Sequence, residues 1–166
     1  MIEAHWLFEA PPEKIQVVIH PQSVIHSMVA YVDGSVIAQL GNPDMRTPIA
    51  HAMGYPDRIE SGVSALDMFK VAHLDFEEPD FKKFPCLGLA YQALAAGGNM
   101  PAVLNAANEI AVESFLKRRM PFTAIPLMIE HAKKTVQQEE MTTLDDVLRT
   151  DAQARNAAQN WLANLQ

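Results

Sequence analysis

A turn signal between two alternating segments limits most strongly what this chain can fold into. Apolar side chains lie on both sides of the alternation in residues 24–32, and Asp33-Gly34 follows directly. Because Asp-Gly readily adopts the positive φ angles of a two-residue turn, the pattern predicts a β-hairpin whose second strand is residues 35–40. Since both faces of this hairpin are largely apolar, we expect each to be covered by helices or by a second subunit.

Prolines and short polar residues mark the ends of the segments around the hairpin. Residues 2–9 are expected to form a helix that stops before Pro11-Pro12, and the apolar residues 15–19 are expected to form a strand. After the hairpin, Asn42-Pro43-Asp44 breaks the strand. Thr47-Pro48 is typical of a helix start, with threonine as the N-cap and proline in the first turn.

Beyond residue 80 the sequence changes to helical patterns separated by short loops. We expect helices at 85–96, ended by Gly97-Gly98, at 101–119, from Thr123 to about 138, and from Thr150-Asp151 towards the C-terminus. Four such helices predict a small bundle. The fold class is therefore α+β. It consists of a partial α/β domain with a mixed sheet and the hairpin at 1–54, an irregular connector at 55–80, and a C-terminal four-helix bundle at 81–166.

Composition excludes several classes of partner. The hydrophobic content of 49% is enough for a packed core, and a net charge of −7 without a basic stripe argues against nucleic-acid binding.

No apolar run approaches the length of a membrane span, and no signal peptide precedes Ile2, so we expect neither membrane insertion nor export. The single Cys86 is expected to be a small buried residue in a cytoplasmic protein.

Six motifs follow one another in an order that is characteristic of a known family. They are IHPQSVIHSMV at 19–29, DGS at 33–35, AQLG at 38–41, PDMRTPIAHAM at 43–53, LNAANEIAV at 104–112 and DDVLRTDAQAR at 145–155. The first four closely resemble the central catalytic domain of the 1-deoxy-D-xylulose 5-phosphate reductoisomerases. The last two are similar to the C-terminal helical domain of that family. The resemblance runs from Ile2 almost to Gln166 and covers about the last two-fifths of such an enzyme.

This resemblance implies an enzyme of the non-mevalonate isoprenoid pathway. The complete protein would convert 1-deoxy-D-xylulose 5-phosphate, a sugar phosphate, to 2-C-methyl-D-erythritol 4-phosphate, using NADPH and Mn²⁺ or Mg²⁺, and would be a homodimer joined through the sheet region. In the family, the dinucleotide-binding domain and the metal and phosphate ligands precede the part that this chain resembles. No Gly-rich strand-to-helix turn occurs here either. We therefore expect these residues alone to bind neither cofactor nor metal and to be inactive.

His26, Pro43 and Met45 are the candidate site residues. Alternation places His26 on one strand face with Val24 and Met28, where it could equally be a packed, hydrogen-bonded histidine. The resemblance implies a supporting catalytic role, in which His26 orients a neighbouring loop or acidic group. The resemblance also places the loop with Pro43 and Met45 against the substrate, as an apolar pocket wall. An ordinary turn with Met45 as core filling is the alternative.

The remaining polar candidates favour structural roles. His20, His51, Asp44 and Asp57 match no zinc-ligand spacing, so they do not predict a metal site. The motif with Asn105, Asn108 and Glu109 is expected to hold neighbouring elements together through hydrogen bonds. Two other functions stay open for the chain. One is a non-catalytic dimerisation or binding module, and the other is a metal hydrolase, which only unspaced histidines favour.

Overall fold

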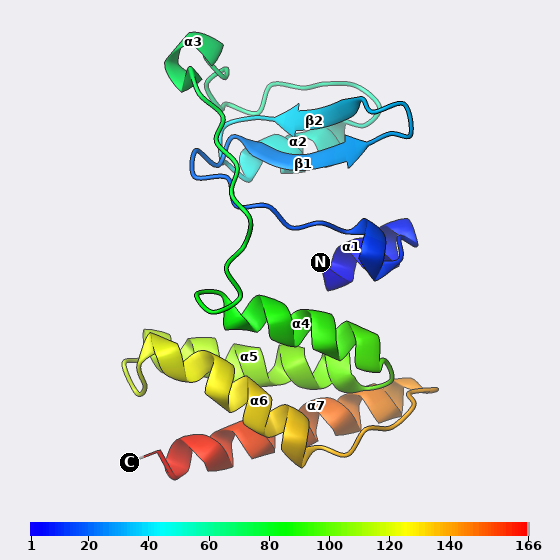
Figure 1. Ribbon diagram of the computed structural model, residues 1–166, viewed down its shortest axis with the longest axis vertical. Helices are drawn as coiled ribbons and strands as arrows, with labels where there is room; N and C mark the ends of the chain where they lie inside the picture. The colour runs from blue at the N-terminus through cyan, green and yellow to red at the C-terminus, as the bar shows by residue number, and fades with distance from the viewer. Residues whose placement is uncertain (166) are drawn as a thin grey trace. The chain divides into compact units, whose positions relative to one another are not determined.

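The computed structural model describes residues 1–165 and combines helices with one small sheet (Figure 1). The residues form two compact units, each with its own internal contacts. One contains Val18–Glu78, and the other contains Met1–Val17 together with the residues from Pro79 onward. None of the helices within residues 1–165 combines the length and the apolarity that crossing a bilayer requires.

The predicted hairpin is present in the unit of residues 18–78. Strand β1 (Ile25–Ala30) pairs antiparallel with β2 (Val36–Leu40), and Gly34 has a φ of 86° in the turn between them. The carboxylate of Asp33 accepts hydrogen bonds from the backbone N–H and the hydroxyl of Ser35, at 2.9 and 2.6 Å. This Asx-type bonding explains why Asp-Gly marks the turn.

The predicted strand at residues 15–19 is wrong. Residues Pro12–Lys14 form the short 3₁₀ helix η1, and only Ile19 joins a β-bridge, in which its backbone N–H and C=O both bond Glu77 at 2.9 Å. Ile19 thus pairs with a segment that is distant in the sequence, and the apolar run around it forms no strand of its own. The sheet formed by residues 1–165 is two-stranded and antiparallel, so the mixed sheet is not found among them.

Helix α2 (Arg46–Gly54) starts before the predicted N-cap Thr47. Met45 occupies the N-cap position, and Thr47 lies within the first turn. The reason is that Asp44 caps the turn, because its side chain accepts from the backbone N–H of Arg46 at 2.9 Å and its C=O accepts from Thr47. Helix α3 (Met68–Val71) follows in the irregular segment, with Asp67 as its N-cap.

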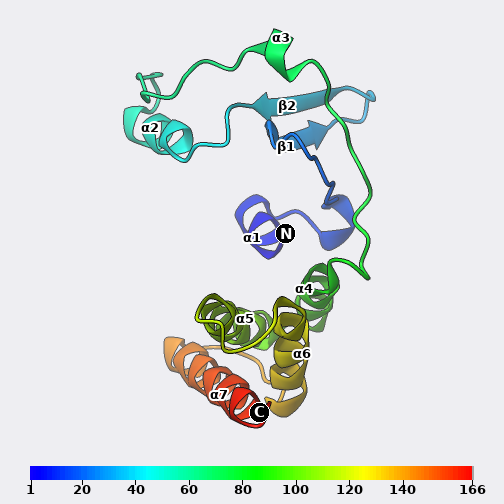
Figure 2. The same ribbon diagram turned by 90° about the vertical axis from the view of Figure 1, so that its left-hand side faces the viewer.

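The second unit is helical. It contains α1 (Ile2–Phe8), α4 (Pro85–Ala96), α5 (Met100–Leu116), η2 (Phe122–Ala124), α6 (Ile125–Thr135) and α7 (Leu144–Ala163). Helix α5 contacts α4, α6 and α7, and Figure 2 shows these helices side by side. Small residues let the helix backbones approach closely, since several alanines on α5, α6 and α7 are fully buried: Ala106, Ala107, Ala111, Ala132, Ala154 and Ala158.

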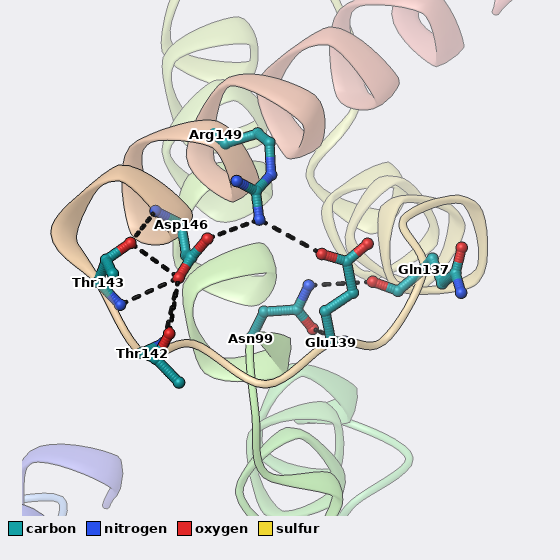
Figure 3. Close-up of polar contacts among 7 residues, drawn as sticks. All are labelled: Asn99, Gln137, Glu139, Thr142, Thr143, Asp146 and Arg149. Atoms are coloured by element: carbon teal, nitrogen blue, oxygen red, sulfur yellow. Dashed lines mark hydrogen bonds and ion pairs between the residues drawn. The ribbon is translucent and has the colours of Figure 1, made fainter.

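The starts of α6 and α7 also differ from the sequence predictions. The last helix begins at Leu144 instead of Thr150, which lies buried within α7. Thr143 and Asp146 form a capping box, in which the Thr143 hydroxyl accepts from the Asp146 N–H and the Asp146 carboxylate accepts from the Thr143 N–H (Figure 3). Thr123 is no N-cap either, because it lies inside η2 and α6 begins at Ile125. The start of α4 at Pro85 and its end at Ala96 are confirmed.

Candidate functional site

The unit of residues 18–78 contains a cavity of about 690 Å³ where the hairpin meets the start of α2. His26, Pro43 and Met45, the three candidates, all line it. The other lining residues are Ser23, Gln39, Gly41, Asn42, Asp44, Thr47, Pro48, His51 and Arg58. Folding therefore brings the predicted residues of the strand and the loop to one concave surface.

A β-bulge places the ring of His26 at this cavity. The strand register runs from Ile25 opposite Leu40 directly to Ser27 opposite Gln39, so His26 is the extra residue. Its Nε2 lies 3.2 Å from the carbonyl oxygen of Gly41. Because a carbonyl only accepts, Nε2 carries the proton in this contact. His26 is hydrogen-bonded but exposed, so it is not the packed core histidine that its alternation allowed.

An ion pair within the loop fixes the backbone around Met45. The guanidinium of Arg46 contacts both carboxylate oxygens of Asp44, with Nη2 2.7 Å from Oδ2 and Nε 3.1 Å from Oδ1. Hydrogen bonding from Arg46 lowers the pKa of Asp44 to about 2, so this carboxylate stays charged at neutral pH. Met45 itself is 71% exposed and does not fill the core of the described residues.

Further contacts hold the irregular segment after α2 against this loop. The Asn42 side-chain amide donates to the carbonyl of Ser64 at 2.7 Å, and Arg46 Nη1 donates to the carbonyl of Gly62 at 3.4 Å. The loop is therefore supported from one side by residues about twenty positions later in the sequence. A loop held in this way can present apolar groups to a ligand without first having to be ordered.

Nine of the lining residues were not among the predicted site residues, and Gln39, His51 and Arg58 are three of these. Gln39 and His51 were not connected with His26, and Arg58 was not considered at all. Arg58 lies in a segment without periodicity, where the general tendency of loops to carry functional residues is the one available signal.

Other polar candidates lie away from the cavity. His20 stacks on Phe76 with ring centroids 5.0 Å apart, and its Nδ1 donates to the carbonyl of Asp75 at 2.8 Å. Glu109 on α5 accepts from Asn105 at 3.0 Å and from Arg155 on α7 at 2.6 Å. Of this motif, Glu109 thus joins α5 to α7 as expected, whereas the bond of Asn105 stays within α5. Cys86 is only half-buried and not fully buried as predicted, and its partial burial raises the pKa of the thiol, which suits a structural cysteine.

The described residues do not fit a metal centre. No three His, Cys, Asp or Glu side chains within residues 1–165 are grouped so that they could hold a metal ion. We therefore assign no metal-dependent reaction step to the side chains of residues 1–165. What the cavity does offer is an apolar wall with a few polar groups that converge on it, which is the usual composition of a small-molecule site.

Comparison with known proteins gives a consistent result for the sequence. The family model described as "DXP reductoisomerase C-terminal domain" matches residues 40–157. A 1-deoxy-D-xylulose 5-phosphate reductoisomerase of Nitrosospira multiformis is 72% identical over 99% of this chain and 42% of its own length. That of Nitrosomonas europaea is 73% identical over 98% of this chain and 40% of its own length. The chain spans about two-fifths of these relatives.

Solved structures give the same result for the fold. The reductoisomerase of Zymomonas mobilis in complex with NADPH has a TM-score of 0.89 at 46% identity, over 97% of this chain and 43% of its own. A DOX-P reductoisomerase in complex with NADPH, fosmidomycin and magnesium also has a TM-score of 0.89, at 44% identity, over 99% of this chain and 42% of its own. The similarity therefore includes both the hairpin region and the helical unit.

Proposed function

This chain belongs to the 1-deoxy-D-xylulose 5-phosphate reductoisomerase family as a C-terminal portion, and we propose that the protein containing it converts 1-deoxy-D-xylulose 5-phosphate to 2-C-methyl-D-erythritol 4-phosphate in isoprenoid biosynthesis. One observation on this chain carries the proposal. The cavity brings His26, Pro43 and Met45 together, although they come from a strand bulge and from a separate loop. These are the residues for which the family resemblance implies a site.

In this proposal the present residues form one wall of the reaction chamber. NADPH would supply the hydride, and Mg²⁺ or Mn²⁺ would polarise the oxygens of the substrate. Pro43 and Met45 contact the ligand as apolar groups and exclude water, while the Asp44–Arg46 pair keeps their loop in place. His26 positions the same loop through its bond to Gly41. The dinucleotide-binding and metal-binding residues are assigned to the preceding part of the protein.

Residues 1–166 alone are expected to be inactive, whereas a full-length chimera should turn over. In this chimera, residues 1–166 replace the matching part of the Nitrosospira multiformis reductoisomerase. The isolated chain has no Gly-rich cradle for a pyrophosphate. NADPH oxidation is measured with deoxyxylulose phosphate and Mg²⁺ for both proteins. Turnover by the isolated chain would refute its assignment as an incomplete enzyme, and a folded but inactive chimera would refute the proposed activity.

We also propose that the protein is a homodimer joined through the hairpin. Val29 and Ile37 face each other across the two strands, and both are largely exposed in the single chain. Exposed cross-strand apolar pairs on an open sheet are typical of surfaces that bind a partner. Sedimentation of the chimera should show a dimer, and Ile37→Glu should shift it towards monomer. A clean monomer of the unmodified chimera at high concentration would contradict the proposal.

The second candidate function is a non-catalytic dimerisation or binding module. The exposed hairpin favours it, because such a surface needs no catalytic groups. A chimera that is folded and dimeric but does not oxidise NADPH would favour this module over the reductoisomerase.

The proposed domain organisation follows the sequence analysis. Residues 1–54 would complete the catalytic and dimerisation domain, and residues 55–80 would connect this domain to a C-terminal four-helix bundle formed by residues 81–166. We propose that the protein is cytoplasmic. The mutual packing of α4, α5, α6 and α7 supports the assignment of the bundle. The contacts within the chain divide it differently, since residues 1–17 belong to the helical unit and residues 55–78 to the unit of the hairpin. Limited proteolysis of the chimera tests the two divisions: cleavage between residues 55 and 78 would support the connector, and protection of that segment would contradict it.

A further inference from the structure

The cavity contains one cation whose charge nothing in the described chain balances. We propose that Arg58 binds a phosphate group of the ligand that occupies this cavity. The proposal rests on the proposed function, because the sugar phosphate and NADPH are the ligands that bring phosphate groups there. It adds one ligand to the phosphate ligands that the family resemblance places in the preceding part of the protein, and it assigns a binding role to a residue that none of the sequence motifs contains.

The charges around the cavity show why Arg58 stands out. Asp44 and Arg58 are the lining residues with a permanent charge, and Asp44 is already paired with Arg46 at 2.7 Å. Within residues 1–165, no carboxylate forms an ion pair with Arg58. Its sequence neighbours Asp57 and Glu60 do not line the cavity. The cavity therefore carries one uncompensated positive charge, which attracts an anion.

The turn after α2 holds Arg58 at the cavity. The backbone N–H of Asp57 donates to the carbonyl of Gly54 at 2.9 Å and closes the turn. The side chain of Ile59 packs against Gly54 so closely that a Cβ there would lie 3.0 Å from Ile59 Cγ2. Arg58 lies between these two anchored positions. Its side chain thus starts from a fixed backbone, which reduces the entropy lost when it binds.

A guanidinium group is well suited to bind a phosphate. Its planar N–H donors match two phosphate oxygens at once, and such charge-assisted pairs are stronger than neutral hydrogen bonds. The apolar wall of Pro43, Met45 and Pro48 lines the same cavity. A bound ligand would shield the pair from water between this wall and Arg58, and shielding strengthens the attraction.

The test is Arg58→Met in the full-length chimera, with KM for deoxyxylulose phosphate and KM for NADPH measured separately. Arg58→Met should raise KM for one of them by about 10-fold to 100-fold, the range for losing a charge-assisted bond. The ligand whose KM rises is the one whose phosphate Arg58 contacts. Raising the salt concentration should weaken binding of that ligand to the unmodified chimera more than to Arg58→Met.

Three further variants are compared with Arg58→Met. Arg58→Lys keeps the charge but loses the two-point contact. Its KM for the affected ligand should therefore lie between the KM of the unmodified chimera and that of Arg58→Met. Met45→Ala, which removes an apolar contact in the same cavity, should weaken binding equally at low and high salt. Lys70→Met removes an exposed cation of the same unit that does not line this cavity, and it should leave both KM values unchanged.

Unchanged KM values in Arg58→Met would overturn the proposal, whether or not the variant loses stability. Lower stability with unchanged KM would mean that Arg58 pairs with a carboxylate from the rest of the protein. Calorimetry of NADPH binding and of sugar phosphate binding distinguishes the proposal for Arg58 from the proposed function. Arg58-dependent binding without turnover would contradict only the proposed function, whereas ligand binding that does not depend on Arg58, together with no turnover, would refute both.

Discussion

Replacing Asn99 by alanine is expected to lower the free energy of unfolding of the helical unit by about 2–4 kcal/mol. Asn99 is fully buried just before α5. Its side-chain amide donates to the carbonyl of Gln137 at 3.0 Å, and its side-chain oxygen accepts from the N–H of Glu139 at 3.1 Å (Figure 3). Alanine would leave both backbone groups without their partner and would open a cavity beside them.

The effect should be large because Asn99 holds the whole connection between α6 and α7. Its backbone N–H also donates to the carbonyl of Glu139, at 2.9 Å. Gly98 lies so close to the same segment that a Cβ would be 2.5 Å from the Glu139 carbonyl oxygen. Further along, Arg149 contacts Asp146 at 2.8 Å and Glu139 at 3.5 Å, which joins this segment to the capped start of α7.

The measurement is denaturant unfolding of residues 1–166, followed by the helical circular dichroism signal. Asn105→Ala is the matched control. It changes an exposed asparagine on α5 whose bond to Glu109 stays within one helix, so its effect should be within about 0.5 kcal/mol. Faster hydrogen exchange at the Glu139 amide would show that the lost stability is local to the connection. Equal, small effects of both variants would contradict the expectation.

Local signals explain which parts of the fold could be predicted. The hairpin follows from Asp33-Gly34 between alternating segments. The limits of α4 follow from Pro85 and Gly97, because proline favours the first turn of a helix and glycine favours the position just after its end. The start of α7 was missed because Thr150-Asp151 has the same composition as a cap, whereas the true cap needs the reciprocal bonds between Thr143 and Asp146.

Long-range contacts explain what could not be predicted. Residue 19 pairs with residue 77, and no local pattern in residues 15–19 indicates that partner. The same limit applies to the cavity. His26, Pro43 and Met45 came from family motifs, but Arg58 reaches them only because the turn after α2 packs against Gly54. The resemblance supplied the candidates, and the three-dimensional arrangement added their neighbours.

His26→Gln in the full-length chimera is expected to lower kcat about 10-fold to 100-fold, the typical loss when a residue that orients catalytic groups is removed. The bulged His26 donates from Nε2 to the carbonyl of Gly41, at the end of β2. The loop with Pro43 and Met45 begins directly after this carbonyl. Loss of the ring should therefore let the loop move while the hairpin itself stays paired.

Kinetic constants distinguish this positioning role from a structural one. We expect kcat to fall while the midpoint of denaturant unfolding stays unchanged, since His26 is exposed and contributes little to the core. Ser27→Ala is the control, because Ser27 is an exposed neighbour on β1 that does not line the cavity, and its kinetic constants should equal those of the unmodified chimera. If His26→Gln also kept its kinetic constants, or lost activity only in proportion to its stability, then the bond to Gly41 would serve the hairpin and not the reaction.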